Sequence, residues 1–124
     1  TVSTANAVRG FSSTPSVGCR ALSLAPGAKL QPALLADVGE GVLISSVSGL
    51  HSGVNPVSGD FSTGAEGLRI TGGSLGEPLR EFTIASTLQR MLADVAAVGA
   101  DIEWLPMRAA GVSLVVHDVT MSGA

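Results

Sequence analysis

The sequence is poor in the residues that usually hold a small domain together. Of its 124 residues only 3% are aromatic, none is Tyr, and Cys19 is the single cysteine. One cysteine excludes an internal disulfide and is typical of a reducing compartment. Because rings are so few, the core of the one domain that this length allows must be built from Val, Leu, Ile and Ala, which bury less area than aromatic side chains.

Charge is also scarce. Charged residues make up 14% of the chain, against about a quarter in an ordinary domain, so we expect part of the surface to face other protein. The formal net charge of -3 and the scattered basic residues argue against a nucleic-acid partner, which needs a clustered Lys/Arg face. No run approaches the roughly 18 apolar residues of a membrane span, so we expect no membrane partner. The chain opens on Thr1 without a signal peptide, and we expect a cytoplasmic C-terminal piece of a longer protein.

The most distinctive stretch is a glycine-rich segment over residues 49–67, which holds five glycines. Asn55 and Pro56 predict a turn, because Pro56 fixes φ and the Asn55 side chain can cap the following backbone. Gly59 can supply the positive φ that a short hairpin loop requires. A β-branched run precedes the turn, and a segment that alternates in polarity follows it. We therefore predict a hairpin with strands near residues 41–48 and 65–71.

The segments on either side give weaker signals. Residues 1–20 are rich in Ser, Thr, Gly and Pro and predict an extended arm or linker, with the domain over residues 21–124. Residues 19–25 suggest a short strand. Pro32 and Gly39 bracket a short helix at about 32–38. The run Thr71-Gly72-Gly73-Ser74 is a second turn signal, and it leads to a predicted strand near residues 78–84.

The strongest helical pattern covers residues of about 86–98. Ser86 and Gln89 have the spacing of a capping box, and Gly99 follows as a C-terminal stop. Between them an apolar stripe recurs at three- and four-residue steps, formed by Leu88, Met91, Leu92, Val95 and Val98. Strands are predicted near residues 102–105 and 112–120. The whole pattern predicts an α+β, mainly β fold, an antiparallel sandwich or partial barrel against which the long helix packs this stripe.

No arrangement of reactive side chains stands out. The potential zinc ligands lack the spacing of a zinc site; they are Cys19, His51, Asp60, Glu66 and His117. Ser52 or Ser58 could form a triad with His51 and Asp60, but such sets arise by chance in a Ser-rich chain, and no Gly-x-Ser-x-Gly elbow is present. Cys19 is predicted to be a buried small hydrophobe, and His117 a strand residue on a polar face. We predict no catalytic residue, no metal ligand and no cofactor in this chain.

Two groups of residues, 53–62 and 64–67, closely resemble the C-terminal domain of the TldD/PmbA family, whose members are also called modulators of DNA gyrase. The similarity extends to residues 34–41 and 77–102 and covers roughly residues 21–124. It implies a cytoplasmic zinc metalloprotease built from two related subunits. The TldD-type subunit carries a His-Glu-x-x-x-His helix upstream of this region and a Cys ligand near its C-terminus. The segment where that Cys would fall, residues 104–111, contains no cysteine, so the chain resembles the PmbA-type subunit, also called TldE, with zinc possible in a TldD-like sister subunit.

Eight residues of the glycine-rich hairpin are predicted to form either a peptide cleft or only a turn: Gly53, Asn55, Pro56, Gly59, Asp60, Ser62, Gly64 and Glu66. A strand that exposes its backbone can pair with an extended peptide, but the same glycines could serve tight turns and close packing alone. The first functional hypothesis is a domain, non-catalytic by itself, of a complex acting on peptides or unfolded proteins, which leaves open whether the chain is part of an enzyme. The alternative is a protein-binding module without proteolysis. Low charge and a loose arm also predict self-association as a two-fold dimer.

Overall fold

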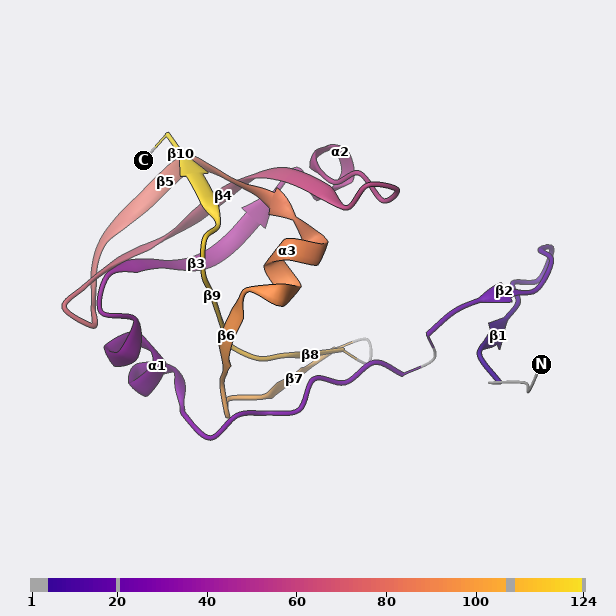
Figure 1. The fold of residues 1–124 in the computed structure, drawn as a ribbon, viewed down its shortest axis with the longest axis horizontal. Helices are drawn as coiled ribbons and strands as arrows, with labels where there is room; N and C mark the ends of the chain where they lie inside the picture. The colour runs from indigo at the N-terminus through magenta and orange to yellow at the C-terminus, as the bar shows by residue number, and fades with distance from the viewer. Residues whose placement is uncertain (1–4, 20, 107–108, 124) are drawn as a thin grey trace.

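The computed structural model describes residues 5–19, 21–106 and 109–123 (Figure 1). In this part of the chain the helices are α1 (Gln31–Val38), α2 (Leu50–Gly53) and α3 (Leu88–Ala93). The strands are β1 (Ala7–Val8), β2 (Ser16–Val17), β3 (Gly41–Ser48), β4 (Asp60–Thr71), β5 (Ser74–Thr87), β6 (Val95–Val98), β7 (Glu103–Leu105), β8 (Ala109–Gly111), β9 (Leu114–Val116) and β10 (Thr120–Ser122). More of the described residues lie in strands than in helices, which confirms the α+β, mainly β class.

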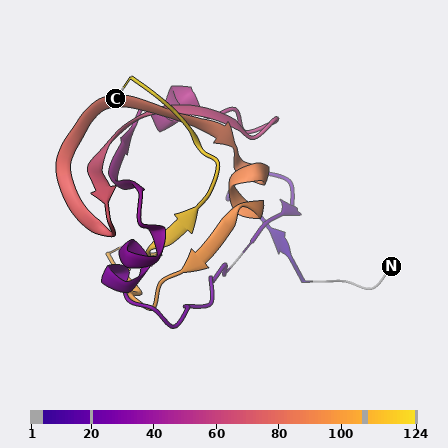
Figure 2. The same ribbon diagram turned by 60° about the vertical axis from the view of Figure 1, so that its left-hand side comes forward.

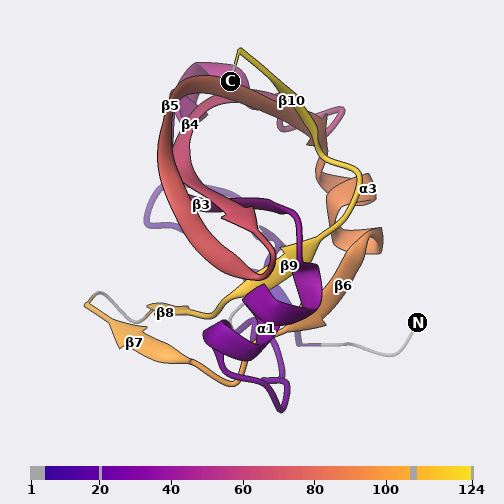
Figure 3. The same ribbon diagram turned by 90° about the vertical axis from the view of Figure 1, so that its left-hand side faces the viewer.

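The body of the molecule is an antiparallel sheet of four strands in the order β10-β5-β4-β3. Its long central hairpin, β4–β5, is closed by Gly72 and Gly73, which have φ of 56° and 76°. Two positive φ values are what a two-residue turn between twisted strands requires, so the second predicted turn is confirmed. The sheet curls strongly without closing into a barrel, as Figures 2 and 3 show.

The core lies on one face of this sheet. Strand β4 alternates along its first half, with Phe61, Thr63 and Ala65 buried and the residues between them exposed or half-buried. Phe82 of β5 pairs with Ala65 and is 1% exposed, the most enclosed large side chain among the described residues. Leu79 completes the central cluster. The period of two therefore separates an apolar inner face from a polar outer face.

Helix α1 forms as predicted. Pro32 lies in its first turn, where a missing N–H costs little. Gly39 ends it with φ 68°, and the Gly39 N–H donates to the Leu35 carbonyl. Leu34 is buried. The first predicted strand also matches β3, and the next two lie within the longer β4 and β5.

The long helix predicted over residues 86–98 is wrong in its second half. Helix α3 stops at Ala93, and residues 95–98 form β6, which pairs with β9. The two Ala residues of this segment favour a helix and the two Val residues a strand, and the pairing with a distant strand decides between them. Leu88 and Leu92 are 39% and 70% exposed, so the predicted packing of the whole stripe on the sheet is wrong as well. The helix is capped by Thr87, not Ser86, through a 3.1 Å hydrogen bond from the Arg90 N–H.

The predicted strand at 112–120 is two strands in different sheets. Strand β9 pairs with β6, whereas β10 pairs with β5. The chain changes direction between them at Asp118, whose φ is 55°. His117 lies in this connection and not in a strand, with an exposed side chain. One long strand could not serve both partners.

Near the N-terminus two expectations fail. Cys19 is exposed rather than buried, and neither Cys19 nor residues 21–25 form a strand; Arg20 lies outside the described residues. Strands β1 and β2 pair only with each other, and their hairpin projects away from the curled sheet (Figure 1). The assignment of residues 1–20 to a separate arm stays a prediction.

Candidate functional site

The glycine-rich turn has the geometry that its sequence predicts. The Asn55 side-chain oxygen accepts hydrogen bonds from the N–H groups of Val57 and Ser58, at 2.9 and 3.2 Å. The Asn55 N–H donates to the Asp60 carbonyl and the Gly59 N–H to the Asn55 carbonyl. Gly59 has φ 81°. Together these bonds hold the shape of the loop, because four of its N–H groups are bonded within the turn itself.

Helix α3 holds this loop from the side, which the sequence did not reveal. The Gln89 amide donates to the Ser58 carbonyl at 3.0 Å, and the Leu88 N–H donates to the Gly59 carbonyl at 2.8 Å. A Cβ at Gly59 would overlap the Gln89 carboxamide. Gln89 therefore positions the loop. In a capping box its side chain would instead bond to the backbone at the start of its own helix. In the sequence, Gln89 was noticeable only through its spacing from Ser86. That spacing predicted a contact between these two residues at the start of the helix, and not a contact of Gln89 with the loop.

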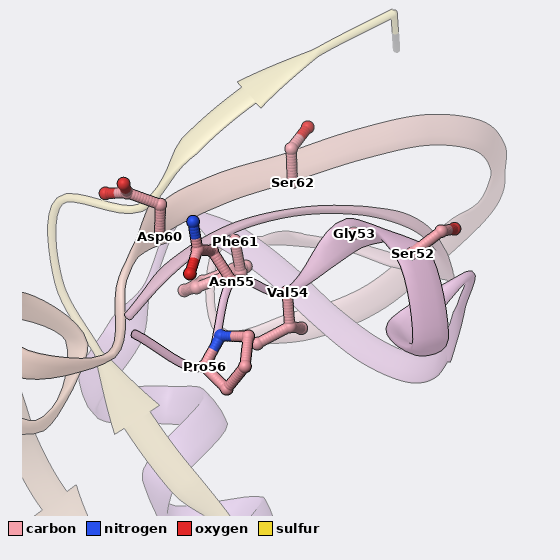
Figure 4. Close-up of a pocket in the computed structure, with 8 residues that line it drawn as sticks. All are labelled: Ser52, Gly53, Val54, Asn55, Pro56, Asp60, Phe61 and Ser62. Carbon is pink, nitrogen blue, oxygen red and sulfur yellow. The ribbon is translucent and has the colours of Figure 1, made fainter. Parts of the chain in front are cut away.

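A shallow hollow of about 510 Å³ opens between the loop and β4 (Figure 4). Its lining consists of Ser52, Gly53, Val54, Asn55, Pro56, Asp60, Phe61 and Ser62. Five of the eight predicted site residues are thus brought together: Gly53, Asn55, Pro56, Asp60 and Ser62. Figure 4 shows the Pro56 ring and the Asn55 amide on the loop side of this hollow, with Asp60 and Ser62 on the strand.

The three other predicted residues lie outside the hollow. Gly59 is buried in the turn against Gln89. Gly64 and Glu66 lie further along β4 on the same face as Asp60 and Ser62, following the period of two. Seven of the eight residues therefore form a hollow and a strip of outer sheet face that runs away from it, and Gly59 lies in the adjoining turn.

Two close backbone approaches explain glycines near the site. A Cβ at Gly53 would overlap the Ser62 carbonyl, and one at Gly67 would overlap the Leu43 carbonyl. Gly53 allows α2 to sit against β4, and Gly67 allows β3 to pair closely with β4. For these two positions the packing role of glycine is established by the geometry.

The sheet has an unpaired edge next to the hollow. Strand β3 is the last strand of its sheet, and it pairs only with β4 among the described strands. The ladder is interrupted between Ile44 and Ser46, and the Ser45 hydroxyl donates to the Glu66 carbonyl across the bulge. After Ser48 the chain enters α2, whose last residue, Gly53, lines the hollow. The C-terminal end of β3 is therefore joined to the hollow through α2.

The charges around the site are exposed and few. The Ser58 hydroxyl donates to the Asp60 carboxylate at 2.6 Å. A second shallow depression of about 390 Å³ shares Asp60 and Phe61 with the first and adds Arg90 and Asp118. Arg90 forms an ion pair with Asp94 at 3.4 Å. Exposed pairs of this kind contribute little to stability.

Two carboxyl groups away from the hollow have shifted acidity. The pKa of Glu77 is lowered by the hydrogen bond from its own backbone N–H and then by the Arg69 side chain. The pKa of Asp101 is lowered by the hydrogen bond from the Ser113 hydroxyl and, less, by the Ser113 N–H. Both causes stabilise the ionised form. These shifts belong to structural contacts and not to the predicted site.

The candidate metal ligands of the sequence do not converge. Across residues 5–19, 21–106 and 109–123, no three His, Cys, Asp or Glu side chains are placed to hold a metal ion. No helix of the described part is long and apolar enough to cross a bilayer.

Comparison with known proteins places the chain in a family. The sequence matches the PmbA/TldA metallopeptidase C-terminal domain over residues 1–123. It is 46% identical over 71 residues to the Metalloprotease PmbA homolog of Haemophilus influenzae and 36% identical over 70 residues to Metalloprotease PmbA of Escherichia coli O157:H7. These alignments cover 57% and 56% of this chain and 15% of each relative. The chain thus spans a small fraction of the curated relatives it matches.

Two solved structures have the same fold. A candidate modulator of a DNA gyrase from Thermotoga maritima superposes with a TM-score of 0.75 at 28% identity, over 79% of this chain and 23% of that one. A candidate modulator of DNA gyrase from Bacteroides thetaiotaomicron gives a TM-score of 0.69 at 29% identity, over 81% and 22%. Sequence and structure agree with the resemblance of residues 53–67. The chain belongs to the PmbA/TldA metallopeptidase C-terminal domain family.

Proposed function

We propose that this chain is a PmbA-type domain, non-catalytic by itself, that guides an extended peptide or unfolded protein segment toward the cleft of a cytoplasmic peptidase complex. Zinc in that complex would be held by a TldD-like sister subunit. Family membership supports the peptidase context. Among the described residues no set of metal ligands converges, which is in keeping with a domain that is non-catalytic by itself.

The observation that carries the proposal is the unpaired edge of β3, which leads to the hollow beside Asn55 and Asp60. A peptide that adds to a sheet edge gains main-chain hydrogen bonds, which do not depend on its sequence. The hollow would then receive one or two side chains of that peptide. Its small polar lining, including Ser52 and Ser62, sets no strong shape requirement.

An extended, fluorescently labelled peptide tests this by anisotropy. We expect binding to be lost when alternate backbone nitrogens of the same peptide are methylated, because each lost hydrogen bond costs about 0.5–1.5 kcal/mol. We also expect Ser62→Leu, which fills the hollow, to weaken binding, and Ser74→Leu at the far turn to leave it unchanged. Equal binding of the methylated peptide would contradict the proposal.

The alternative is a protein-binding module that acts without proteolysis; the two structural neighbours are named as modulators of DNA gyrase, which is itself a protein. Exposed apolar side chains near the site favour some protein partner, for example Leu50 at 54% and Val57 at 93% exposure. Co-purification of the intact protein with its sister subunit distinguishes the two. A complex that contains zinc and cleaves casein supports the peptidase role, and a stable complex without zinc or cleavage supports the alternative.

A further inference from the structure

Two rows of residues cross the inner face of the sheet from β5 to β3. Residues that lie directly opposite each other on neighbouring strands share a face of the sheet. Phe82 of β5 lies opposite Ala65 of β4, which in turn lies opposite Val47 of β3. The second row consists of Leu79, Gly67 and Ile44. Both rows therefore run from the centre of the core to the unpaired edge of β3.

Exposure rises along each row toward that edge. Phe82 and Ala65 are 1% and 3% exposed, whereas Val47 is 41% exposed. In the second row the exposure rises from 9% at Leu79 to 37% at Ile44. Among the described strands none lies beyond β3 in this sheet. The apolar face of the core is thus left only half covered where it reaches β3.

The outer face of the same part of β3 is polar. Ser46 and Ser48 lie opposite Glu66 and Gly64 of β4. A Cβ at Gly64 would overlap the Ser48 hydroxyl, so this hydroxyl lies over β4 on the outer face. Because side chains alternate between the two faces of a strand, Val47 points to the inner face between these two serines. The end of β3 therefore presents one apolar side chain flanked by two polar ones.

The bulge in β3 decides which part of the edge can pair regularly with a peptide. Ser45 is the extra residue after Ile44, and its hydroxyl donates to the Glu66 carbonyl at 3.1 Å. Ile44 and Val47 share the inner face although they are three positions apart, whereas a regular strand returns to the same face at every second residue. A regular peptide strand therefore cannot match both. The part of β3 that α2 joins to the hollow is residues 46–48.

We propose that the edge of β3 beyond the bulge selects peptides whose side chains alternate between apolar and polar, with an apolar side chain opposite Val47. This selection rests on the proposed function, because it requires that a peptide adds to β3 as a strand. The apolar side chain extends the row of Phe82 and Ala65 and covers Val47, while its two neighbours in the peptide lie beside Ser46 and Ser48. Such alternation is typical of half-buried strands of folded proteins. The substrate class is therefore an amphipathic strand segment of an unfolded protein.

Three labelled peptides of equal length, with the same charged ends for solubility, test this selection by anisotropy on the full 124-residue chain. In the first Val alternates with Thr, in the second all these positions are Thr, and in the third all are Val. Both residues are β-branched and favour strands, so the peptides offer the same main-chain hydrogen bonds. We expect the alternating peptide to bind about two- to fivefold more tightly than the all-Thr peptide, the range for one cross-strand apolar pair. The all-Val peptide should bind no more tightly than the alternating one, because its additional apolar side chains lie beside serines.

Substitutions in β3 then identify the residue that selects. Val47→Thr should abolish the preference for the alternating peptide and leave the affinity for the all-Thr peptide unchanged, because only the apolar contact is lost. Ser46→Thr, on the outer face of the same strand, is the matched control and should leave the preference as it is. A preference that survives Val47→Thr would overturn the proposal.

The same measurements separate the selection from the proposed function. If the three peptides bind equally and methylation of their backbone nitrogens still abolishes binding, the selection is wrong and the addition of a strand to β3 stands. If none of the three peptides binds, the proposed function fails and the selection fails with it.

Discussion

The Asp101 carboxylate accepts two hydrogen bonds from Ser113, one from the hydroxyl at 2.6 Å and one from the backbone N–H at 3.2 Å. The same hydroxyl accepts a 3.0 Å hydrogen bond from the Gln31 amide at the start of α1. Three segments that are distant in sequence meet at this serine. The contact ties the base of the β7–β8 hairpin to the remainder of the domain.

This contact predicts a pH dependence. The pKa of Asp101 is lowered in the folded state, so its contribution is present above its ordinary pKa and is lost as the pH falls through the lower, folded-state value. We expect Asp101→Asn to lower stability at neutral pH and to flatten the loss of stability below about pH 4. Urea unfolding at several pH values measures this. Glu103→Gln, on the exposed strand β7, is the control, and identical acid limbs for both variants would contradict the prediction.

The core predicts a sharp contrast between two apolar positions. Phe82→Ala should lower the free energy of unfolding by about 3–5 kcal/mol, because it empties an enclosed position. Leu92→Ala should cost no more than about 0.5 kcal/mol, because its side chain is 70% exposed. Chemical denaturation of both variants checks the difference, and similar losses would place Leu92 in the core.

The cap of α3 can be assigned by two alanine substitutions. Thr87→Ala should cost about 1 kcal/mol, because the Arg90 N–H loses its acceptor. Ser86→Ala should leave this cap intact and cost less. Thermal unfolding of the two variants distinguishes them, and a larger loss for Ser86→Ala would restore the capping box that the sequence suggested.

The turn beside the hollow predicts a large effect of one methyl group. Gly59→Ala should destabilise by at least about 1–2 kcal/mol, the cost of a positive φ for a residue with a Cβ, with further loss from overlap with Gln89. It should also weaken peptide binding, because the loop forms one wall of the hollow. Gly76→Ala is the matched control, since its Cβ would make only an ordinary contact with the Arg69 carbonyl. Equal behaviour of the two variants would show that the loop is not rigid.

Local chemistry made much of this structure predictable. Pro32 and Gly39 set the bounds of α1, and Asn55 with Gly59 specified the turn, because each acts through bonds within a few residues. Pairs such as Gly72 and Gly73 act in the same way. At these places the backbone conformation depends on the residues themselves and hardly on their surroundings.

What the sequence could not predict depends on distant partners. Residues 95–98 fit either period, and only β9, some twenty residues later, makes them a strand. The contact of Gln89 with Ser58 joins residues 31 apart. The exposure of Leu92 and Cys19 likewise depends on which surfaces the rest of the chain happens to cover. Of the candidate site, the loop was visible in the sequence, whereas its support from α3 was not.

The far end of the β4–β5 hairpin bears on the order of folding. Its strands are joined by two residues, so their ladder closes with little loss of chain entropy and can form within microseconds. At the turn, the Gly73 N–H donates to the Gly39 carbonyl and the Gly72 N–H to the Glu40 carboxylate, both at 2.8 Å. A preformed hairpin thus offers two donors at the point where α1 ends and β3 begins. We expect helix α1 and the edge strand to condense onto this hairpin once it has formed, so that substitutions at the turn slow refolding more than they speed unfolding.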